Sequence, residues 1–325
     1  MFNLNFKSMK KNFIFLIAAL CCAGMISATE GALSGKFTIN AAGDQIVFSQ
    51  GNLQATTTDL GANWTWSFAA NQWDIIGAAA ANTAITGNGT VNANGTVDLF
   101  GWSTAATYYG IQYDYDNNSY AGDFVDWGNN AITNGGNEAN KWRTLTNAEL
   151  VYIFRTRANA ANLYGQAVVN DIHGCILLPD GADPAALGFT ATPNDWTTNQ
   201  YSGDSWTTLA DAGAVFLPCA GYRFKQMVVD IGLYGNGWYG NYSTATPIDE
   251  DIRSSMEIGE NYVAYDYTMN RCYGASVRLV QAAPGGTTAL DNAAVDAKAV
   301  KRIVDGKLLI ERDGKAFNAL GAEVK

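Results

Sequence analysis

The apolar residues of this chain fall in short runs, each closed by a residue that ends regular structure. Gly, Pro, Asn or Asp bounds the runs Gln45–Phe48, Thr96–Phe100, Cys175–Leu178, Ala214–Leu217 and Ala275–Val280. Runs of about four to eight apolar residues between turn formers are typical of β-strands. The sequence therefore predicts short strands in a loop-heavy fold with few helices.

Two segments carry helix signals. Thr146 and Glu149 have the spacing of a capping box, in which each side chain accepts a hydrogen bond from the backbone N–H of the other residue. Apolar residues at positions 150, 153 and 154 form one face of the helix expected to follow. A second, shorter helix is expected from about Ser205 to Ala212.

The N-terminal residues 1–28 have the order of a secretory signal peptide. Lysines come first, residues 12–23 are mostly apolar, and Ala28 is the small residue before the expected cleavage site. A membrane anchor is a poorer interpretation, because a bilayer span takes roughly 20 apolar residues. Lipid attachment at Cys21 or Cys22 is a minority alternative. We expect an exported protein, at the cell surface or outside the cell, with no membrane span after cleavage.

The chain beyond the leader divides into a body, a linker and a tail. We assign residues 29–281 to the body and residues 282–299, which begin with a Pro/Gly/Thr stretch, to the linker. Residues 300–325 contain two Asp-Gly pairs between short strand-like runs. That dipeptide adopts the positive dihedral angles of tight hairpin turns. The tail is therefore predicted to be a small antiparallel β meander.

Charge, histidine and cysteine content exclude several classes of function. The formal net charge is −10, which disfavours nucleic acid as a partner. His173 is the one histidine, and Cys175, Cys219 and Cys272 are the cysteines beyond the leader, so a zinc site of three or four such ligands is not expected. His173 and Cys175 have the spacing of a dyad, but the simpler interpretation is an imidazole beside a buried thiol. No catalytic residue is predicted.

Seven segments in order resemble a known family. They resemble the Fibrobacter succinogenes major paralogous domain family, found on exported proteins of Bacteroidota, over roughly residues 35 to 281. The segments are Gly35–Asn40, Val47–Leu53, Asp98–Trp102, Trp142–Glu149, Ile176–Asp180, Gly213–Arg223 and Tyr273–Val280. The resemblance implies an α+β fold similar to C-type lectins and to formylglycine-generating domains, with short, twisted antiparallel strands, few helices and long loops. It implies that Trp142–Glu149 enters the helix and that Tyr273–Val280 holds the last core strand.

The resemblance also bears on activity and export. Formylglycine-generating relatives use a cysteine pair near the end of the domain, and only Cys272 lies there, so that activity is not carried over. The tail resembles, in a shorter form, the sorting tails of proteins that use the type IX secretion machinery. This likeness implies surface delivery or attachment with that machinery as a partner.

Two aromatic-rich segments, about residues 108–120 and 233–244, carry the strongest binding signal. Tyr and Trp alternate there with Gly, Asn and Ser, the composition of surfaces in which rigid rings give contact area and small polar residues give hydrogen bonds. The alternative is that the loops pack on themselves and bury their rings. The predicted ligand-binding residues are Tyr234, Trp238, Tyr239, Tyr242, Tyr113 and Tyr115.

No cofactor is predicted, with calcium as the alternative. An oxygen-rich site is conceivable at Asp114, Asp116 and Asn118 or at Asp249–Asp251, since calcium prefers carboxylate and amide oxygens. The first segment departs from an EF-hand loop because it lacks the glycine at the sixth position and has Val125 where a bidentate glutamate belongs. The simpler interpretation is a polar turn.

These features together indicate an exported, non-catalytic bacterial surface protein that recognises a glycan or a protein through aromatic-rich loops. One alternative is a carbohydrate-active enzyme with a carboxylate pair, because acidic residues are abundant and the sequence gives no distances between them. Another is a structural envelope protein.

Overall fold

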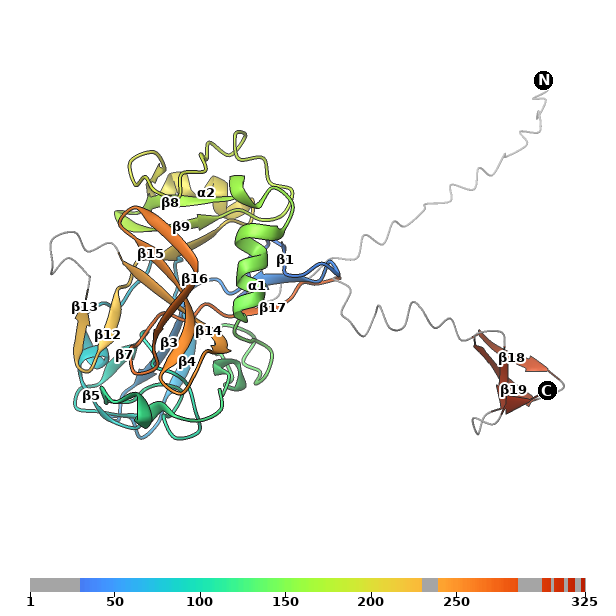
Figure 1. Cartoon of the computed structure of the whole chain (residues 1–325), viewed down its shortest axis with the longest axis horizontal. Coiled ribbons are helices and arrows are strands. Elements are labelled where there is room, and N and C mark those ends of the chain that lie inside the picture. Colours follow the sequence, from blue (N-terminus) through green and yellow to red (C-terminus); the bar gives the residue numbers. More distant parts are fainter. Residues whose placement is uncertain are drawn as a thin grey trace, which may run out of the picture.

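A computed structural model of the chain describes residues 30–229 and 239–285 and, in the tail, four strands from residue 300 onward (Figure 1). The predicted signal peptide and residues 286–299 of the predicted linker lie outside the described residues. Strands account for 34% of the structure and helices for 13%, which places the chain in an α+β or mostly-β class. Within the described ranges, no helix has the length and apolar content that crossing a bilayer requires.

The strands are short and belong to several small sheets. Three sheets have three strands each, in the orders β1-β2-β17, β4-β3-β7 and β14-β15-β16. Their strands are β1 (Phe37–Thr38), β2 (Gln45–Phe48), β17 (Val280–Ala282), β3 (Leu53–Thr57), β4 (Thr65–Phe68), β7 (Gly95–Val97), β14 (Gly240–Pro247), β15 (Ile252–Gly259) and β16 (Tyr262–Asn270). All neighbours in these sheets are antiparallel, as the family resemblance implies.

A four-stranded sheet and two hairpins complete the body. The sheet has the order β10-β8-β9-β11, and β10 is parallel to β8 while the other neighbours are antiparallel. The strands of the sheet are β8 (Tyr164–Val169), β9 (Ile172–Leu177), β10 (Gln200–Tyr201) and β11 (Val215–Pro218). One hairpin pairs β5 (Ile85–Gly87) with β6 (Thr90–Val91), and the other pairs β12 (Tyr222–Phe224) with β13 (Met227–Val229). Long loops and single 3-10 turns join them.

Both predicted helices are present. The helix α1 (Asn147–Val151) starts at the predicted capping box, whose two reciprocal hydrogen bonds between Thr146 and Glu149 both form, and continues as a π-helical turn, Tyr152–Thr156. The helix α2 (Gly203–Asp211) begins two residues before the predicted start. The helix starts earlier because Ser202 caps its N-terminus, accepting a hydrogen bond from the N–H of Ser205 at 3.1 Å.

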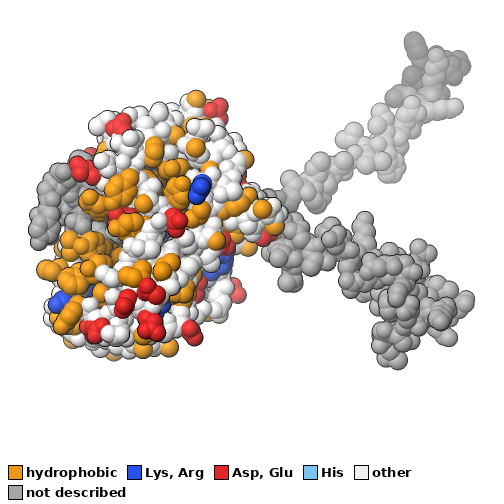
Figure 2. Space-filling model, viewed as in Figure 1, with side chains coloured by type: hydrophobic (Ala, Val, Ile, Leu, Met, Phe, Trp, Pro, Cys, Tyr) orange, Lys and Arg blue, Asp and Glu red, His pale blue; other side chains and the backbone are white. Residues whose placement is uncertain are grey.

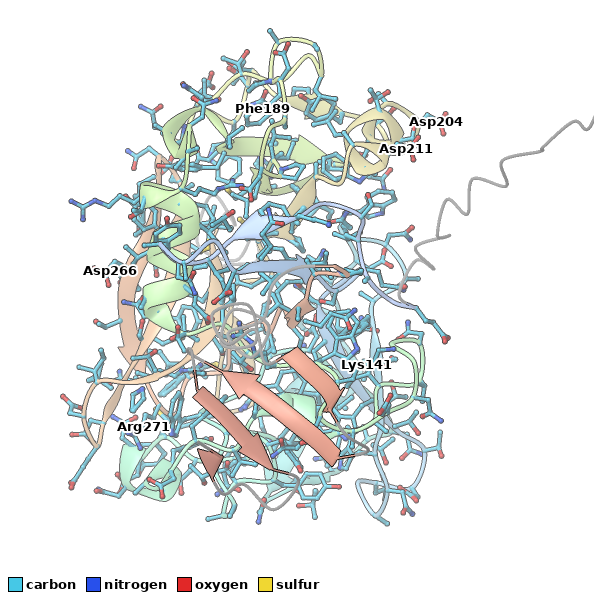
Figure 3. The ribbon with its side chains drawn as sticks, turned by 90° about the vertical axis from the view of Figure 1, so that its right-hand side faces the viewer. Lys141, Phe189, Asp204, Asp211, Asp266 and Arg271 are labelled. Atoms are coloured by element: carbon cyan, nitrogen blue, oxygen red, sulfur yellow. The ribbon has the colours of Figure 1, made fainter. Side chains whose placement is uncertain are left out.

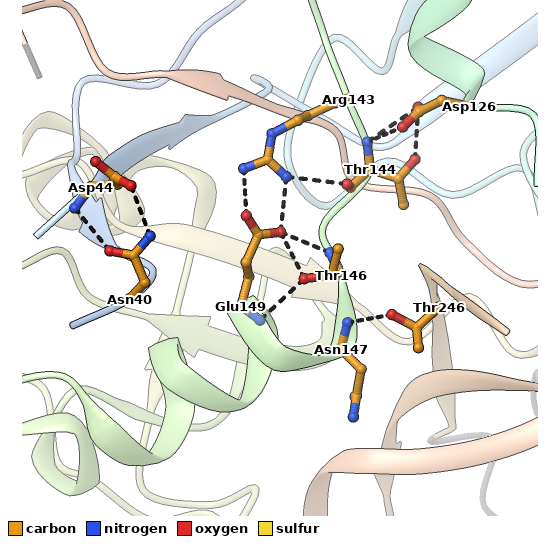
Figure 4. A network of polar contacts seen from close by, with 9 residues as sticks. All are labelled: Asn40, Asp44, Asp126, Arg143, Thr144, Thr146, Asn147, Glu149 and Thr246. Carbon is orange, nitrogen blue, oxygen red and sulfur yellow. Dashed lines mark hydrogen bonds and ion pairs between the residues drawn. The ribbon is translucent and has the colours of Figure 1, made fainter. Parts of the chain in front are cut away.

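A polar network fixes α1 to the rest of the body (Figure 4). The Arg143 guanidinium donates two hydrogen bonds to the Glu149 carboxylate, at 2.7 and 2.8 Å. The N–H of Asn147 donates to Thr246 Oγ1 at 2.9 Å, which joins the start of α1 to β14. Burial acts to raise the pKa of Glu149, but hydrogen bonds from Arg143 and from the Thr146 N–H outweigh it and leave that pKa below its ordinary value.

The core consists of contiguous clusters of buried side chains between these layers. The central core cluster, which includes Phe48, Phe154 and Met256, packs between α1 and the strands β2, β9, β11, β14 and β15. A second cluster around Trp66 and Trp127 lies among β3, β4, β7 and the neighbouring loops. In Figure 1 the long strands β14, β15 and β16 run through the middle of the body, with β8 and α2 near its top and β5 near its bottom.

Asp98 is a buried carboxylate behind the second cluster, only 1% exposed. It accepts hydrogen bonds from the N–H of Ile76 at 2.8 Å and from Asn82 Nδ2 at 2.5 Å, so it fixes the loop after β4. Burial raises its pKa from 3.8 to about 6, even though these hydrogen bonds act in the opposite direction.

We expect this carboxylate to make stability pH-dependent, which a comparison with Asp98→Asn tests. The folded state binds the Asp98 proton more tightly than the unfolded chain does. The resulting stabilisation is complete below the unfolded pKa and is lost as the pH rises through about 6. Between about pH 7.5 and 4.5 the unfolding free energy of the wild type should therefore rise by about 2 kcal/mol relative to Asp98→Asn. Urea unfolding at both pH values measures the difference, and an unchanged difference would contradict the raised pKa.

The tail strands form a separate antiparallel sheet of order β18-β19-β20-β21. The strands are β18 (Val300–Val304), β19 (Lys307–Arg312), β20 (Lys315–Asn318) and β21 (Glu323–Val324). Val304 pairs with Lys307 and Arg312 pairs with Lys315, so each of the first two strand pairs flanks one Asp-Gly dipeptide. These strands coincide with the runs on which the sequence predicts the meander.

Candidate functional site

The predicted ligand-binding residues that the structure describes do not lie together. Tyr234 and Trp238 lie outside the described residues. Tyr239, the residue just before β14, is partly exposed. Tyr113 and Tyr115 are 38% and 64% exposed and belong to a different loop.

Tyr242 is a core residue, which corrects its prediction as a ligand-binding residue. Its side chain is 4% exposed and belongs to the central core cluster. Its hydroxyl donates to the Pro218 carbonyl at 2.8 Å and accepts from Asn52 Nδ2 at 3.2 Å, and burial raises its pKa. Asn241 lines the cleft together with Tyr239, and Tyr242, the next residue of β14, points to the opposite face of the strand. Tyr239 takes the outer face and Tyr242 the core.

The outer face of the β14-β15-β16 sheet forms one wall of an open cleft of about 470 Å³. This tyrosine cleft, as we call it, is lined by Tyr222, Tyr239, Asn241, Ile252, Glu257, Tyr262, Tyr267, Thr268, Met269, Asn270 and Tyr273. Its volume falls within the range of about 300–1,000 Å³ that is common for small-molecule sites. Figure 2 shows side chains of the hydrophobic class, which includes tyrosine, gathered over the region that Figure 1 labels β14, β15 and β16.

A β-bulge in β16 brings Tyr267 to this cleft. Glu257 pairs with Ala264 and Ser255 pairs with Tyr267, so a two-residue step on β15 spans a three-residue step on β16. The extra residue reverses the alternation of side chains and moves Tyr267 to the face that carries Glu257. Tyr265, on the other face, packs against the central core cluster.

Tyr262 lies across the chain from a glycine that leaves room for its ring. Gly259 pairs with Tyr262, and a Cβ atom added at Gly259 would lie 2.3 to 2.8 Å from three atoms of the Tyr262 ring. The hydroxyl of Tyr262 donates a hydrogen bond to Glu257 Oε1. Gly259 therefore sets where the ring lies, and Glu257 holds its hydroxyl.

The remaining wall of the cleft is an aromatic stack supported from below. The rings of Tyr222 and Tyr273 stack with centroids 5.2 Å apart, and Phe224 meets Tyr273 edge-on at 5.3 Å. Beneath them, fully buried Arg253 donates to the Tyr273 carbonyl at 2.6 Å and to Ser243 Oγ at 2.8 Å. This arginine thus joins the stack to β14 and β15.

Two charged residues on or next to β16, Asp266 and Arg271, do not contribute to the cleft. Figure 3 shows Asp266 and Arg271 along one edge of the body. Asp266 accepts a hydrogen bond from Asn147 Nδ2 at 2.9 Å, which ties β16 to α1. Arg271 is 6% exposed, and its guanidinium lies over the Trp102 ring at 5.1 Å from the centroid. Neither side chain lines the cleft.

A second hollow of about 420 Å³, which we call the acidic hollow, contains the first of the two segments considered for calcium. It is lined by Asp114, Tyr115, Asp116, Asn117 and Asp251. Asp114 accepts from Ser119 Oγ at 2.6 Å, and Asp116 accepts from the backbone and side-chain amides of Asn118, as in an ordinary polar turn. The ring of Tyr115 is covered by Lys225 Nζ, 3.8 Å from its centroid.

The second calcium segment, at residues 249–251, also forms a turn. Asp249 Oδ1 accepts from the backbone N–H groups of Asp251 and Ile252 at 2.8 and 2.7 Å. Across the part of the chain that the structure describes, no group of three or more His, Cys, Asp or Glu side chains is placed to hold a metal ion. Calcium binding stays an untested alternative.

The geometry does not favour a cysteine nucleophile. Cys175, Cys219 and Cys272 are unpaired and buried. Burial raises the pKa of the Cys175 thiol to about 12, whereas a nucleophilic cysteine needs a thiolate near neutral pH. His173 packs edge-on against Trp196, with ring centroids 4.9 Å apart, and burial lowers its pKa. These features agree with the simpler interpretation of an imidazole beside a buried thiol.

Sequence reasoning missed most of the cleft. Tyr222, Glu257, Tyr262, Tyr267 and Tyr273 line it together with the predicted Tyr239. The tyrosine-rich stretch at 262–267 indicates an aromatic strand, but the β-bulge decides which of its tyrosines face the cleft. No protein-family model, curated protein or solved structure matches this chain, so the case for the site depends on its geometry.

Proposed function

We propose that this chain is an exported, non-catalytic recognition protein that binds a carbohydrate in the tyrosine cleft. The observation that carries the proposal is the lining itself, in which five tyrosines surround a few amide, hydroxyl and carboxylate groups. The face of an aromatic ring is negative and attracts the C–H groups on the apolar face of a sugar. Amide and hydroxyl groups then hydrogen-bond the sugar hydroxyls and fix its orientation.

Binding fits the cleft better than hydrolysis does. Glycoside hydrolysis commonly uses two carboxyl groups that flank the scissile bond. Glu257 is the one carboxylate among the residues described as lining the cleft. In the acidic hollow, Asp114 and Asp116 hold their own turn through hydrogen bonds. The partly exposed tyrosines also favour recognition over a purely structural role, since Tyr262 and Tyr267 are 37% and 38% exposed.

We further propose that the body has a C-type-lectin-like fold of the Fibrobacter succinogenes major paralogous domain family, and that the tail serves export or surface attachment. Seven ordered sequence segments support the family assignment. The capped helix at Thr146 and the low helix content agree with it. The leader sequence and the four-stranded tail support delivery to the surface through the type IX route.

A glycan array probed with the mature chain, residues 29–325, tests the proposal. We expect binding to at least one group of related glycans. We also expect a chelator to leave that binding unchanged, because the described residues of the lining include a single carboxylate. A folded sample that binds no glycan would contradict carbohydrate recognition. Loss of all binding in chelator would instead indicate a calcium site.

A further inference from the structure

Glu257 lies among tyrosine side chains in the cleft. It is on β15 directly opposite Asn241 of β14 and Ala264 of β16, in the middle of the sheet face that forms the cleft wall. Its Oε1 atom accepts a hydrogen bond from the hydroxyl of Tyr262. Tyr267, brought to the same face by the bulge, is the second tyrosine beside it.

The negative charge of Glu257 acts on both neighbouring phenols. It is the largest cause that raises the pKa of Tyr267, with burial and a hydrogen bond to the carboxylate adding to it. For Tyr262, burial raises the pKa most, and the hydrogen bond and charge of Glu257 raise it further. Both phenols therefore remain neutral donors, and the carboxylate is the charged group of this wall.

The lining combines this carboxylate with aromatic faces, and its described residues include no lysine, arginine or histidine. The chain as a whole has a formal charge of −10. An anionic sugar such as a uronate or a sulfated residue would meet repulsion from Glu257 without a basic group in the lining to offset it. A cationic group would be attracted by the carboxylate and by the ring faces, because aromatic rings bind ammonium groups over their faces.

We propose that the carbohydrate bound in the tyrosine cleft carries a protonated amino group, and that Glu257 accepts a hydrogen bond from it. This inference rests on the proposed carbohydrate recognition and names the substrate class, an amino sugar with a free amine. The tyrosine rings contact the apolar face of the sugar and the ammonium group. The Thr268 hydroxyl, which is exposed, and the half-buried Asn270 amide also line the cleft and can hydrogen-bond the sugar hydroxyls.

Calorimetric titration of the mature chain with two matched oligosaccharides tests the inference. A glucosamine hexamer carries free amines, and an N-acetylglucosamine hexamer has the same backbone without charge. We expect the free-amine hexamer to bind at least about tenfold more tightly at a pH where its amines are protonated, since a hydrogen bond to a charged group contributes about 1.5–3 kcal/mol. Added salt should weaken the binding of this hexamer more than that of the acetylated one.

The variant Glu257→Gln separates charge from shape. Its side-chain oxygen still accepts from the Tyr262 hydroxyl, so the cleft should keep its form. We expect the variant to lose about tenfold or more in affinity for the free-amine hexamer. Any loss of affinity for the acetylated hexamer should be smaller than this, because that sugar has no ammonium group to bind the carboxylate.

Three other outcomes would contradict the amino-sugar inference, the proposed carbohydrate recognition, or both. Equal or tighter binding of the acetylated hexamer, unchanged in Glu257→Gln, would overturn the amino-sugar inference and leave carbohydrate recognition in place. Binding of neither hexamer, together with no glycan on the array, would overturn both. If Nα-acetyl-lysine amide binds as tightly as the free-amine hexamer, the occupant is a protein side chain and the sugar assignment fails.

Discussion

Replacing Tyr262 and Tyr267 together by alanine is expected to weaken binding of the preferred glycan by about a thousandfold. Aromatic residues at the centre of a binding site typically contribute about 2 kcal/mol or more each, and about 1.4 kcal/mol corresponds to tenfold in affinity. Both rings are partly exposed on the cleft wall, so their removal takes away contact area without opening the core. Titration of the variant with the glycan identified on the array measures the loss.

Two variants control this prediction. Tyr115→Ala removes an even more exposed tyrosine outside the cleft, and we expect its affinity to equal that of the wild type. Gly259→Ala keeps all tyrosines but places a methyl group where the Tyr262 ring lies. We expect it to reduce affinity while changing stability little, because the ring can rotate outward. If the double variant binds the glycan as tightly as the wild type does, the glycan does not bind in the tyrosine cleft.

Replacing Arg253 by alanine is expected to lower the free energy of unfolding by about 3–5 kcal/mol, the range for large changes at buried positions. The side chain is fully buried and hydrogen-bonds to Ser243 Oγ and to the backbone carbonyls of Tyr273 and Phe100. Its loss leaves a cavity and buried acceptors without donors, each of which costs about 1–3 kcal/mol. Urea unfolding monitored by circular dichroism measures the effect.

The exposed Arg155 provides the matched control. Arg155→Ala should change the unfolding free energy by no more than about 0.5 kcal/mol, since it removes the same side chain from the surface. Because Arg253 also supports the Tyr222–Tyr273 stack, we expect Arg253→Ala to weaken glycan binding at temperatures where it is still folded. A variant as stable as the wild type would show that the arginine does not anchor this wall.

Features that depend on neighbouring residues were predictable from the sequence. The capping box at Thr146 needs only two side chains three residues apart, and the structure contains both of its hydrogen bonds. The strand β2 coincides with its predicted run, and the tail strands flank the Asp-Gly pairs. The early start of α2 follows from Ser202, a cap that the apolar pattern alone does not indicate.

The cleft was less predictable because it is built from separate segments. Tyr222, Glu257 and Tyr273 come together only through the pairing of β14, β15 and β16 and the hairpin beside them. The position of Tyr267 depends on a bulge, and a one-residue shift in register moves a side chain to the opposite face. Strand alternation alone, however, would have placed Tyr239 and Tyr242 on opposite faces.

The most direct test of the account is a crystal structure of the mature chain with a bound glucosamine oligosaccharide. We predict a sugar ring within van der Waals contact of Tyr262 or Tyr267, with its amine within hydrogen-bond distance of the Glu257 carboxylate. A sugar bound in the acidic hollow around Asp114 and Asp251, with the tyrosine cleft empty, would contradict the central claim.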